Sequence, residues 1–532
     1  MAFLATALLT VGCTSIRDVG DLEAELLAPD HCLDTIVVGD FQRGTGASGS
    51  PYLICNLDQL NHFTTFCNTT SPSCTSMFFQ LGADIDLAAA GNNGAFTPIK
   101  VFQGTFDGNN KTISNWLYTA ANLADPSGTI EADIGQTIQH PDFNLGFFRK
   151  LDAGGVVKNL ALADVALQGR FYTGALVGYM VAGSSVQNCS ASTNGNVADV
   201  GDRTKFAGMI VGYNNLVTGG ASGHTGGLIG AAEAGTTITS SSFSGVVRGA
   251  MSVGGFVGQL LGSTVSNCHS SGAVFGSDGN EGGLIGTIDD NGAGGITAVS
   301  LSYSTANVVT TSTSIGGLVG SMVDRSTITT SYFNGDVSGG SIMGGIAGNM
   351  TGSTTSITKS FAVGTVNGGA VLGGLVGLMY DSGSGGATLS DSFAMNTITF
   401  TAGNMWNFYV GGAGGAVGCM HDAGTVNRVY AAGSIVDHTG AVSVNSGDLV
   451  GGSSTTATPG PVGTRIVTDS FADTAVSANG FVGSGAINLL TVSNSSSLTT
   501  ANMKISGSYF GWDFNTVWQM SQGTNNGYPT LR

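Results

Sequence analysis

The residues of this chain that could do acid–base chemistry are a small set of aspartates. Hydrolysis of a glycosidic bond needs two carboxylates held across the bond, and a lyase needs a base with groups that stabilise developing charge. The acidic candidates are Asp84 with Asp86, Asp107, and Asp289 with Asp290. The first three lie in predicted turns, where aspartate commonly accepts hydrogen bonds from backbone amides. The last two lie in a loop ending at Gly294-Gly295, without a nearby His, Arg or Lys in the sequence. We therefore expect solvated turn residues and no catalytic residues.

Other catalytic signatures are weak or missing. Gly223-His224-Thr225 resembles the Gly-His-Gly of pectinases, but the partner residues are not in the expected order. The sequence contains no G-x-S-x-G elbow, P-loop or H-E-x-x-H motif. Its glycines do not form calcium-binding nonapeptides, because acidic residues are missing at the needed interval. We expect a protein that is not an enzyme; the alternative is a carbohydrate-active β-helix enzyme, either a polysaccharide lyase or a glycosidase.

The chain has 8 cysteines, which could form disulfides or bind metal. Cys67 and Cys74 flank the polar loop Asn68 to Ser73, and we expect a disulfide between them in an oxidising compartment. The pairing of Cys32 and Cys55 stays open. No spacing gives a C-x-x-C zinc pattern, so we expect neither a metal site nor a cofactor.

The N-terminus reads as a short apolar run that ends at small residues before Cys13. It is far too short to span a bilayer and predicts a signal peptide at 1–13. It resembles a bacterial lipoprotein signal, in which Cys13 would become the lipidated N-terminus. Two features depart from that pattern: no basic residue precedes the run, and Thr10 replaces the usual Leu. We expect export, and Cys13 is the candidate residue for a lipid anchor; whether it is lipidated stays open.

Composition favours a β-rich architecture with many tight turns. Glycine supplies 86 of 532 residues, hydrophobic residues reach 42% and charged residues only 10%, a balance opposite to that of disordered chains. Glycine without a G-X-Y period also excludes collagen. The net charge of −17 comes without any Lys/Arg cluster, which argues against nucleic-acid binding. No later stretch has 18 uninterrupted apolar residues, so no transmembrane helix is expected.

An internal repeat of the type G-G-L-V-G organises most of the chain. Its cores are Gly174–Gly178, Gly208–Gly212, Gly227–Gly230, Gly255–Gly258, Gly283–Gly286, Gly317–Gly320, Gly345–Gly348, Gly374–Gly377, Gly415–Gly418 and Asp448–Gly451. The closing glycines are 34, 18, 28, 28, 34, 28, 29, 41 and 33 residues apart, so the basic unit is 28 residues, with insertions and one short unit. One repeat cannot bury its apolar face alone, whereas stacked repeats bury a continuous core.

A second segment of ten residues follows each core. It places an aliphatic residue first and tenth, Ser or Cys usually fourth and an aromatic usually fifth, as in Ile328–Val337 and Ile357–Val366. Such short, β-branched segments predict strands. Cys189 and Cys268 occupy the fourth position and are predicted to be small inward-facing residues. The fifth-position aromatics predict a ladder, either as core or corner stacking or as a sugar-binding platform: Tyr303, Tyr332, Phe361, Phe393 and Tyr430.

We predict an all-β fold, a single-chain parallel β-helix of about 11 rungs of roughly 28 residues each. An open solenoid exposes strand edges, so both ends need caps. Asn56 is the predicted N-cap of a short helix over the first rung, and the aromatics from Trp512 onward predict a closing cap. The predicted divisions are a signal peptide at 1–13, a linker at 14–38, an N-terminal cap with lead-in strands at 39–145, the solenoid at 146–490 and a C-terminal cap at 491–532.

The glycine cores resemble the GLUG motif of bacterial surface proteins. The segments similar to the usual lead-in are Pro51–Ile54, Leu57-x-x-Leu60, Ala83–Leu87 and Gly104–Asn109, and those similar to the usual ending are Trp512–Phe514, Val517-Trp518 and Gly527–Pro529. The resemblance covers about residues 40–532. It implies exported, surface-associated proteins that are often described as adhesin-like, and it carries no catalytic residues to transfer.

We therefore expect an exported, non-catalytic cell-surface protein that acts in adhesion or in contact with the cell envelope. Its partner would be a glycan or protein on a host or neighbouring cell. Its location would be extracellular or at the cell surface, as an outer-membrane lipoprotein if Cys13 is lipidated. A further alternative is a threonine face that binds ice or crystalline polysaccharide, since Thr237 and Thr239 alternate, as do Thr327 and Thr329, although other rungs break the row.

Overall fold

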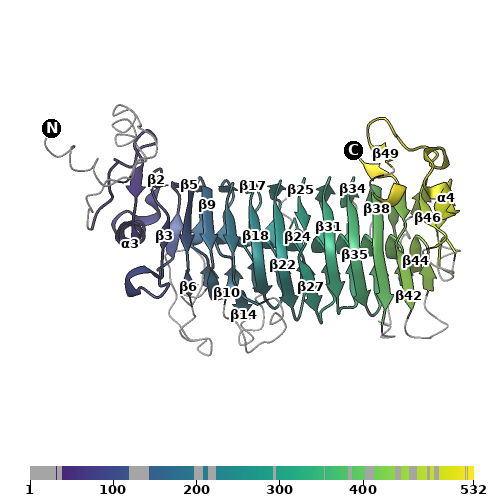
Figure 1. Cartoon of the computed structure of the whole chain (residues 1–532), viewed down its shortest axis with the longest axis horizontal. Coiled ribbons are helices and arrows are strands. Elements are labelled where there is room, and N and C mark those ends of the chain that lie inside the picture. Colours follow the sequence, from purple (N-terminus) through teal and green to yellow (C-terminus); the bar gives the residue numbers. More distant parts are fainter. Residues whose placement is uncertain are drawn as a thin grey trace, which may run out of the picture.

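The computed structural model shows an elongated β-helix with additional structure at each end (Figure 1). It describes residues 32, 39–118, 143–196, 208–213, 223–290, 295–352, 354–380, 386–401, 412–437, 445–454, 464–475, 480–483, 490–521, 523 and 525–532. The predicted signal peptide with Cys13 lies outside the described residues, as does the predicted linker apart from Cys32. Within the described part of the chain, no helix is long and apolar enough to cross a membrane.

Each turn of the solenoid adds one strand to an 11-stranded parallel sheet. Its strands are β4 (Ile99–Phe102), β8 (Phe148–Leu151), β11 (Val177–Met180), β16 (Ile229–Ala232), β20 (Val257–Leu261), β24 (Ile285–Asp289), β29 (Val319–Val323), β33 (Ala347–Thr351), β37 (Val376–Tyr380), β40 (Val417–His421) and β44 (Val450–Ser454). From β11 onward, each strand begins at the residue before the closing glycine of a core. The glycine repeat and this sheet therefore share one register.

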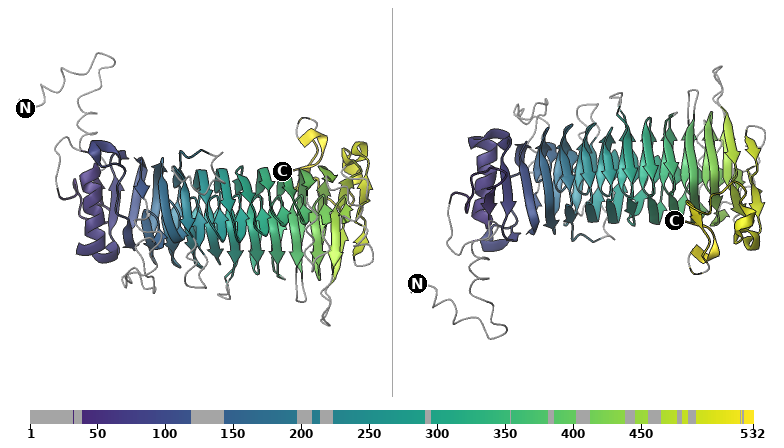
Figure 2. Two further views of the ribbon diagram at one scale, coloured as in Figure 1. Left: turned by 90° about the horizontal axis from the view of Figure 1, so that it is seen from below. Right: turned by 90° about the horizontal axis from the view of Figure 1, so that it is seen from above.

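A 37-stranded sheet supplies the rest of each turn, and the strands of successive turns lie side by side along one axis (Figure 2). At its N-terminal end are β1 (Tyr52–Ile54), β2 (Phe78–Leu81), β3 (Ile85–Asp86), β5 (Thr105–Ser114), β6 (Leu117–Tyr118), β7 (Phe143–Leu145), β9 (Val156–Ala163), β10 (Ala166–Thr173) and β14 (Ile210–Tyr213). Short strands that carry the first position of the ten-residue segment are β12 (Ser185–Gln187), β17 (Thr237–Thr239), β21 (Thr264–Ser266), β25 (Thr297–Ser300), β30 (Ser326–Thr329), β34 (Ser356–Thr358), β45 (Arg465–Thr468) and β47 (Thr491–Ser493).

Two further groups complete the 37-stranded sheet. The strands that follow the first position, or include it, are β13 (Ser190–Ser192), β18 (Ser242–Arg248), β22 (His269–Gly276), β26 (Tyr303–Ser304), β27 (Asn307–Thr310), β31 (Tyr332–Ser338), β35 (Phe361–Gly368), β38 (Ala387–Phe400), β41 (Gly424–Ala431), β42 (Ser434–Asp437), β46 (Phe471–Asp473) and β48 (Ser496–Leu498). The strands just before the glycine cores are β15 (His224–Gly226), β19 (Ser252–Gly254), β23 (Asn280–Gly282), β28 (Ser314–Gly316), β32 (Ile342–Gly344), β36 (Val371–Gly373), β39 (Gly412–Gly414) and β43 (Asn445–Gly447).

The register predicted from the ten-residue frame is the observed one. Ile328 pairs with Ile357 and Tyr332 pairs with Phe361, so the two ten-residue segments align without an insertion or deletion. The predicted all-β parallel β-helix is therefore confirmed. The 11-stranded sheet starts at β4, so the regular stack already begins in the lead-in strands, before residue 146.

The predicted short unit between Gly212 and Gly230 is not a turn of its own. β14, which contains Gly212, pairs with β10 and β18 in the 37-stranded sheet, whereas β11 pairs directly with β16 in the 11-stranded sheet. The prediction that Gly208–Gly212 is a glycine core was therefore wrong. A separation of 18 residues is too short to complete a turn that needs 28, and the segment instead adds an extra strand to one long turn.

A left-handed residue at the third position of the ten-residue segment turns the chain between its two strands. These residues have φ between 46° and 55°: Asn159, Asn188, Ser240, Asn267, Leu301, Thr330, Lys359, Asp391, Arg428, Asp469 and Asn494. Asparagine and aspartate adopt this conformation readily, whereas a bulky or β-branched residue is strained in it. Leu301 and Thr330, like Lys359 and Arg428, are therefore among the costly members of the row.

Paired glycines are required where backbones of successive turns approach closely. A Cβ on Gly283 would lie 2.1 Å from the carbonyl oxygen of Gly317, and a Cβ on Gly255 would lie 2.1 Å from that of Gly283. Both distances are far below van der Waals contact, so no other residue fits without a backbone shift. The glycine motif is thus required for the close packing of the backbone.

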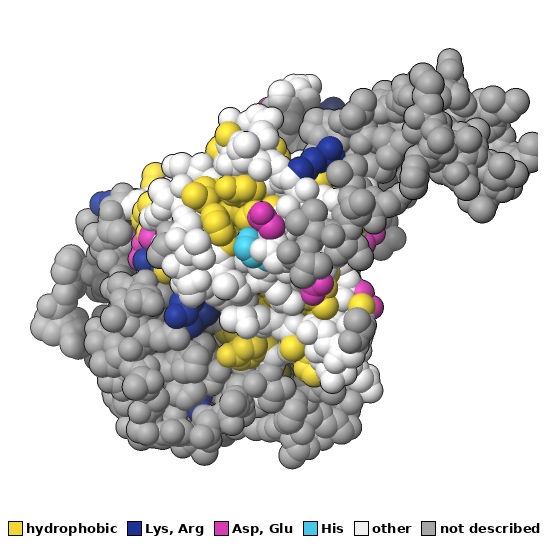
Figure 3. All heavy atoms as spheres, turned by 90° about the vertical axis from the view of Figure 1, so that its left-hand side faces the viewer, with side chains coloured by type: hydrophobic (Ala, Val, Ile, Leu, Met, Phe, Trp, Pro, Cys, Tyr) yellow, Lys and Arg dark blue, Asp and Glu magenta, His cyan; other side chains and the backbone are white. Residues whose placement is uncertain are grey.

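Helix α3 (Leu57–Thr65) lies at the N-terminal end of the solenoid. The Asn56 side chain accepts a hydrogen bond from the Gln59 amide at 3.0 Å, which confirms the predicted N-cap. Phe63 is fully buried, and its ring centre lies 4.6 Å from that of Phe79 in β2. Figure 3 shows this end of the molecule, where hydrophobic side chains gather beside acidic residues and a histidine.

The remaining short helices lie in the two end regions. They are a π-helical turn (Phe66–Thr70), helix α4 (Thr500–Met503) and 3-10 turns at Pro72–Cys74, Ala89–Gly91, Ser506–Ser508 and Asn525–Gly527. β49 (Trp518–Gln519) and β50 (Thr530–Leu531) form an antiparallel pair. In Figure 1 this pair lies over the outside of the last turns, near β38.

Candidate functional site: an aromatic ladder on the outside of the solenoid

Six aromatic rings at the fifth position form a continuous stack along the solenoid. From the N-terminal side they are His269, Tyr303, Tyr332, Phe361, Phe393 and Tyr430. Neighbouring ring centres are 4.8 to 5.1 Å apart, and neighbouring ring planes differ by only 2 to 4°. The spacing is that of hydrogen-bonded strands, so the stack follows directly from the parallel register. The predicted ladder exists, and the sequence prediction missed only its first member, His269.

Strand alternation places this ladder on the outer surface. Ser331 and Phe333, on either side of Tyr332, are fully or almost fully buried, whereas Tyr332 itself is partly exposed. Successive side chains of a strand point to opposite faces, so a buried fourth and sixth residue direct the fifth outward. The ladder is therefore a surface feature.

The C-terminal segment (residues 500–532) covers the last two rings, Phe393 and Tyr430, which we name the covered half. Both rings are buried, at 2% and 0% exposure. The Tyr430 hydroxyl donates a hydrogen bond to the Pro529 carbonyl at 2.6 Å and accepts one from Asn525 Nδ2 at 2.6 Å. Burial raises the pKa of the Tyr430 hydroxyl well above its usual value, so it stays a proton donor at neutral pH.

Aromatic residues of the C-terminal segment make most of this cover. Trp518 lies 6.3 Å from Phe393 and 6.0 Å from Tyr430, with ring planes inclined by 50° and 52°. The Trp512 indole donates a hydrogen bond to the Asp469 carbonyl at 2.6 Å, next to the last turns. The predicted closing aromatics thus lie against the side of the solenoid.

The first four rings, which we name the open half, are only partly buried: His269, Tyr303, Tyr332 and Phe361. Phe361 forms the border, because it also packs against the covering cluster. In the part of the chain that the structure describes, the hydroxyls of Tyr303 and Tyr332 have no hydrogen-bond partner. Partial burial raises the pKa of Tyr332 and lowers that of His269, which favours a neutral ladder.

The ladder geometry does not suit a sugar-binding platform. Sugars pack on the exposed face of an aromatic ring, but each ring between the ends of the stack has both faces against neighbours. What the open half offers to solvent is a row of ring edges with two hydroxyl groups. Of the two interpretations that the sequence left, the stacking one fits the geometry.

The aspartates in the lead-in turns are occupied by local hydrogen bonds. Asp84 accepts from the Thr112 amide at 2.7 Å, and Asp86 accepts from Asn115 Nδ2 at 2.7 Å. This contact with Asn115, helped by the Ala88 amide, lowers the pKa of the Asp86 carboxyl. These groups hold turns, as predicted.

Asp107 also holds structure, because it joins adjacent turns. Its carboxylate accepts from the Asn109 amide at 2.9 Å and from Asn159 Nδ2 at 3.0 Å, and it lies 3.2 Å from Lys158 Nζ. These contacts tie the Asp107 carboxylate to its own turn and to the adjacent strand β9.

The remaining sequence candidates lie in separate places. Asp289 ends β24, and Asp290 lies 3.7 Å from Arg325, a partner that the sequence interpretation missed because it comes from the next turn. His224 is buried at 5% exposure, stacked 5.4 Å from Tyr172, and burial lowers its pKa to about 4. A buried, neutral imidazole does not fit the exposed catalytic histidine of a pectinase-like site.

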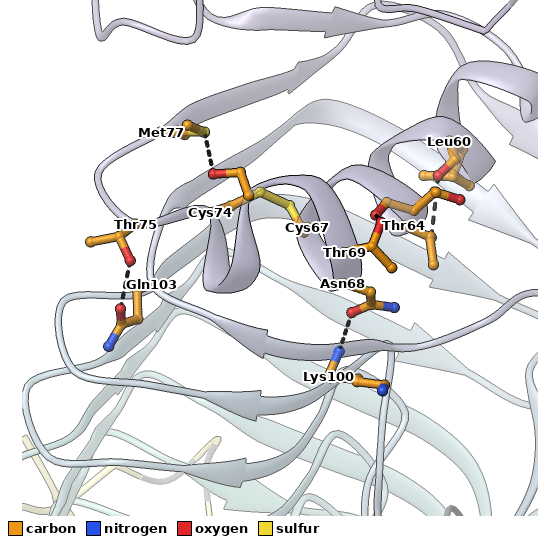
Figure 4. The surroundings of a disulfide bond; sticks show 12 residues. Leu60, Thr64, Cys67, Asn68, Thr69, Cys74, Thr75, Met77, Lys100 and Gln103 are labelled. Atoms are coloured by element: carbon orange, nitrogen blue, oxygen red, sulfur yellow. Dashed lines mark hydrogen bonds between the residues drawn. A yellow bond between two sulfur atoms is a disulfide. The ribbon is translucent and has the colours of Figure 1, made fainter. Parts of the chain in front are cut away.

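Two disulfides fasten the N-terminal cap. Cys67 pairs with Cys74, as predicted, and Cys32 pairs with Cys55, which the sequence left open. Figure 4 shows the first of these at the end of the helical segment, close to Asn68, whose side chain accepts from the Lys100 amide at 2.8 Å. The cap is therefore bonded covalently to itself and by hydrogen bonds to β4.

Cys189 and Cys268 are buried and unpaired, which confirms their prediction as stack residues. The Cys268 amide donates to Ser302 Oγ at 3.1 Å, one step of a row in which each fourth-position hydroxyl accepts from the preceding turn. Burial raises the pKa of both thiols to about 12, so they are unreactive as nucleophiles. Among the described residues, no group of three His, Cys, Asp or Glu side chains could hold a metal ion.

Threonine and serine share the outer face of the short first-position strands. Thr237 and Thr239 align with Thr264 and Ser266 of the next turn, and the following turn interrupts one column with Ala298. The row is thus more continuous than the threonines alone suggested, but it mixes two side chains of different size.

One ionisable residue that the sequence interpretation missed lies inside the solenoid. Glu281 in β23 is fully buried and pairs with Val253 and Ile315, both core residues. Ser312 Oγ donates a hydrogen bond to its carboxyl group, and burial raises its pKa to about 8. The signal was present in the sequence, because the residue before the paired glycines is aliphatic in the adjacent turns.

Comparison with known proteins identifies the repeat motif. Residues 249–274 match the family model of the GLUG motif, a range that contains the core Gly255–Gly258. Halomucin of Haloquadratum walsbyi is 28% identical over 225 residues, which make up 41% of this chain and 2% of halomucin. The chain therefore spans only a small fraction of the length of this curated relative.

Two solved structures are similar at low scores. A Bacteroides ovatus protein assigned as an immunoglobulin A1 protease has a TM-score of 0.30 at 16% identity, with 94% of this chain and 99% of that chain covered. An IgA1 protease has a TM-score of 0.33 at 14% identity, with 76% and 23% covered. Likenesses at these scores carry no argument about this chain. The motif match confirms what the repeats predicted: this chain carries the GLUG motif.

Proposed function

We propose that this chain is an exported, non-catalytic cell-surface protein whose solenoid presents its outer faces for adhesion or for contact with the cell envelope. The observation that carries the proposal is the pair of disulfides in the N-terminal cap, Cys32–Cys55 and Cys67–Cys74. Disulfides persist in oxidising compartments outside the cytosol and are rare within it. The GLUG motif in the same chain supports this interpretation.

The architecture supports a role in presenting the outer faces of the solenoid to a partner. Eleven parallel strands at about 4.8 Å per turn make a rod of about 50 Å in which every turn is bonded to the next. The surface of such a rod is large, and charged residues make up only 10% of the chain. The carboxylates that could have served a glycosidase hold turns or neighbouring strands, which supports the non-catalytic part of the proposal.

The partner in this proposal is a glycan or a protein on a host or neighbouring cell. The location is extracellular or at the cell surface. Lipidation of Cys13 would make the chain an outer-membrane lipoprotein, and the acidic net charge of −17 would keep the rod away from anionic lipid headgroups.

Fractionation of producing cells tests the location. We expect the wild-type chain in the membrane fraction and the Cys13→Ser variant in the soluble exported fraction, with Cys189→Ser as a matched control that stays membrane-bound. A chain that stays in the cytosol with reduced cysteines would overturn the proposal.

Binding and enzyme assays with the purified protein test the proposed adhesion and the absence of catalysis. Binding to cells or to a glycan array above the level of an unrelated β-solenoid of similar charge is the expected result. Release of reducing ends or unsaturated sugars from a polysaccharide panel would replace the non-catalytic proposal with the enzyme alternative.

A further inference from the structure

The covered half of the ladder shows what kind of chain segment this surface accepts. Its occupant is the chain's own C-terminal segment, in which Trp518 supplies an inclined ring and Pro529 a carbonyl oxygen. The buried cluster at this contact is almost entirely aromatic: Phe393, Tyr430, Phe471, Met503, Tyr509, Trp512, Trp518 and Tyr528. The covered half of the ladder therefore binds an aromatic segment that contains a proline.

The open half continues the same surface without a break. Phe361 packs against Phe393 at 4.8 Å and 2°, and the rings before it keep the same plane within 4°. Parallel rings in one register direct their hydroxyls along the same outward line. The hydroxyls of Tyr303 and Tyr332 thus repeat the arrangement of Tyr430, but without the carbonyl acceptor that Tyr430 has in Pro529.

The exposed ring edges of the open half determine which chemical groups can bind there. The edge of an aromatic ring is its electropositive part and prefers the face of another ring or a carbonyl oxygen. Trp518 meets Phe393 and Tyr430 in this inclined manner, at 50° and 52°. A peptide with aromatic side chains and free carbonyl groups satisfies the same preference on the open half.

A strained backbone conformation occurs at Leu301, close in sequence to the open half. Leu301 precedes Tyr303, has φ of 51° and is 58% exposed, although asparagine occupies the equivalent position, Asn267, in the preceding turn. A leucine there costs stability and exposes apolar surface to water, and such costs gather at functional surfaces. Leu301 thus adds an exposed apolar side chain two residues before Tyr303 in the chain.

We propose that the open half, His269, Tyr303, Tyr332 and Phe361, is a docking surface for a short aromatic, proline-containing peptide segment of another protein. Four rungs span about 14 Å, which accommodates about four residues of extended peptide. The peptide would accept hydrogen bonds from Tyr303 and Tyr332 through its carbonyl groups, as Pro529 does from Tyr430. This inference deepens the proposed function, since it names the chemistry of one partner of the rod.

A synthetic peptide with the sequence of residues 509–531 is the probe, titrated onto the full exported chain by calorimetry. We expect binding to the wild type, a loss of about tenfold in affinity for the double variant Tyr303→Phe/Tyr332→Phe, and a loss of several-fold for Leu301→Asn. Tyr380→Phe makes the same chemical change on the 11-stranded sheet and is expected to leave affinity unchanged. A scrambled peptide controls for composition.

Three results would overturn the inference. One is the absence of wild-type binding. A second is equal binding by the double variant, which would mean that the peptide displaces the chain's own C-terminal segment from the covered half. Oligosaccharides that bind through Tyr303 and Tyr332 where the peptide does not would also overturn it, in favour of a sugar site. Cell binding that survives in the double variant would leave the proposed function standing while removing the ladder from it.

Discussion

Raising the pH should destabilise the solenoid through one buried carboxyl group, that of Glu281. This side chain takes the place of an aliphatic core residue, between Val253 and Ile315 of the adjacent turns, and is fully buried. Burial is the main cause that raises its pKa from 4.5 to about 8, and the hydrogen bond from Ser312 only partly opposes it. At neutral pH the folded chain therefore holds the neutral acid, whereas the unfolded chain holds the carboxylate.

The sign of the effect follows from proton binding. Between about pH 4.5 and 8 the folded state binds more protons than the unfolded state, so the free energy of unfolding falls as pH rises. Each pH unit in this window is worth about 1.4 kcal/mol, which gives a loss of up to about 5 kcal/mol over the whole window. The full stability is present below about pH 4.5, and the loss is complete once the pH has passed 8.

Glu281→Gln removes the titration and keeps an oxygen that accepts from Ser312. We expect the urea midpoints of wild type and variant to agree at about pH 5 and to diverge progressively up to about pH 9, with the variant more stable. Hydrogen exchange at the β23 amides would locate the effect in this turn. Glu281→Val, which restores the residue type of Val253, is the second variant and should show the same flat pH profile even if the lost hydrogen bond shifts its midpoint. Parallel pH profiles for wild type and both variants would refute the reasoning.

Three further tests address the register, the turns and the cap. Leu375→Asp places a charge at a fully buried core position and should cost about 4 kcal/mol or more, whereas Leu375→Ile should cost less than about 1.5 kcal/mol; equal thermal midpoints would contradict the register. Thr330→Asn relieves a β-branched residue at φ 49° and should stabilise by about 1 kcal/mol in urea unfolding, and a destabilised variant would count against strain at this turn. The double change Cys67→Ser/Cys74→Ser should lower the stability of the N-terminal cap by about 2–3 kcal/mol, while Cys268→Ser, whose neighbouring turns carry serine, should change little; the reverse order would contradict both assignments.

The sequence predicted the parts of this fold that repeat. Each turn is bonded to the one before it, so a residue such as Tyr332 has its equivalent, Phe361, at a fixed separation in the chain. Gly208–Gly212 was misread because a short motif does not show which sheet its strand joins, and only pairing with β10 and β18 settles that. The irregular contacts were beyond reach for the same reason: Tyr430 and Pro529 are 99 residues apart and share no periodicity.

The rings that the C-terminal segment leaves uncovered can be compared with those that it covers. The two phenylalanines lie at the border and under the C-terminal segment, whereas the rings left open, His269, Tyr303 and Tyr332, carry polar atoms at their edges. An exposed tyrosine edge is compatible with water, so solvation alone would account for leaving these rings uncovered. Solvation does not account for Leu301, which exposes an apolar side chain in a left-handed conformation that asparagine adopts with less strain. The substitution Leu301→Asn therefore separates the two explanations: a docking surface gains stability and loses peptide affinity, whereas a merely solvated edge gains stability alone.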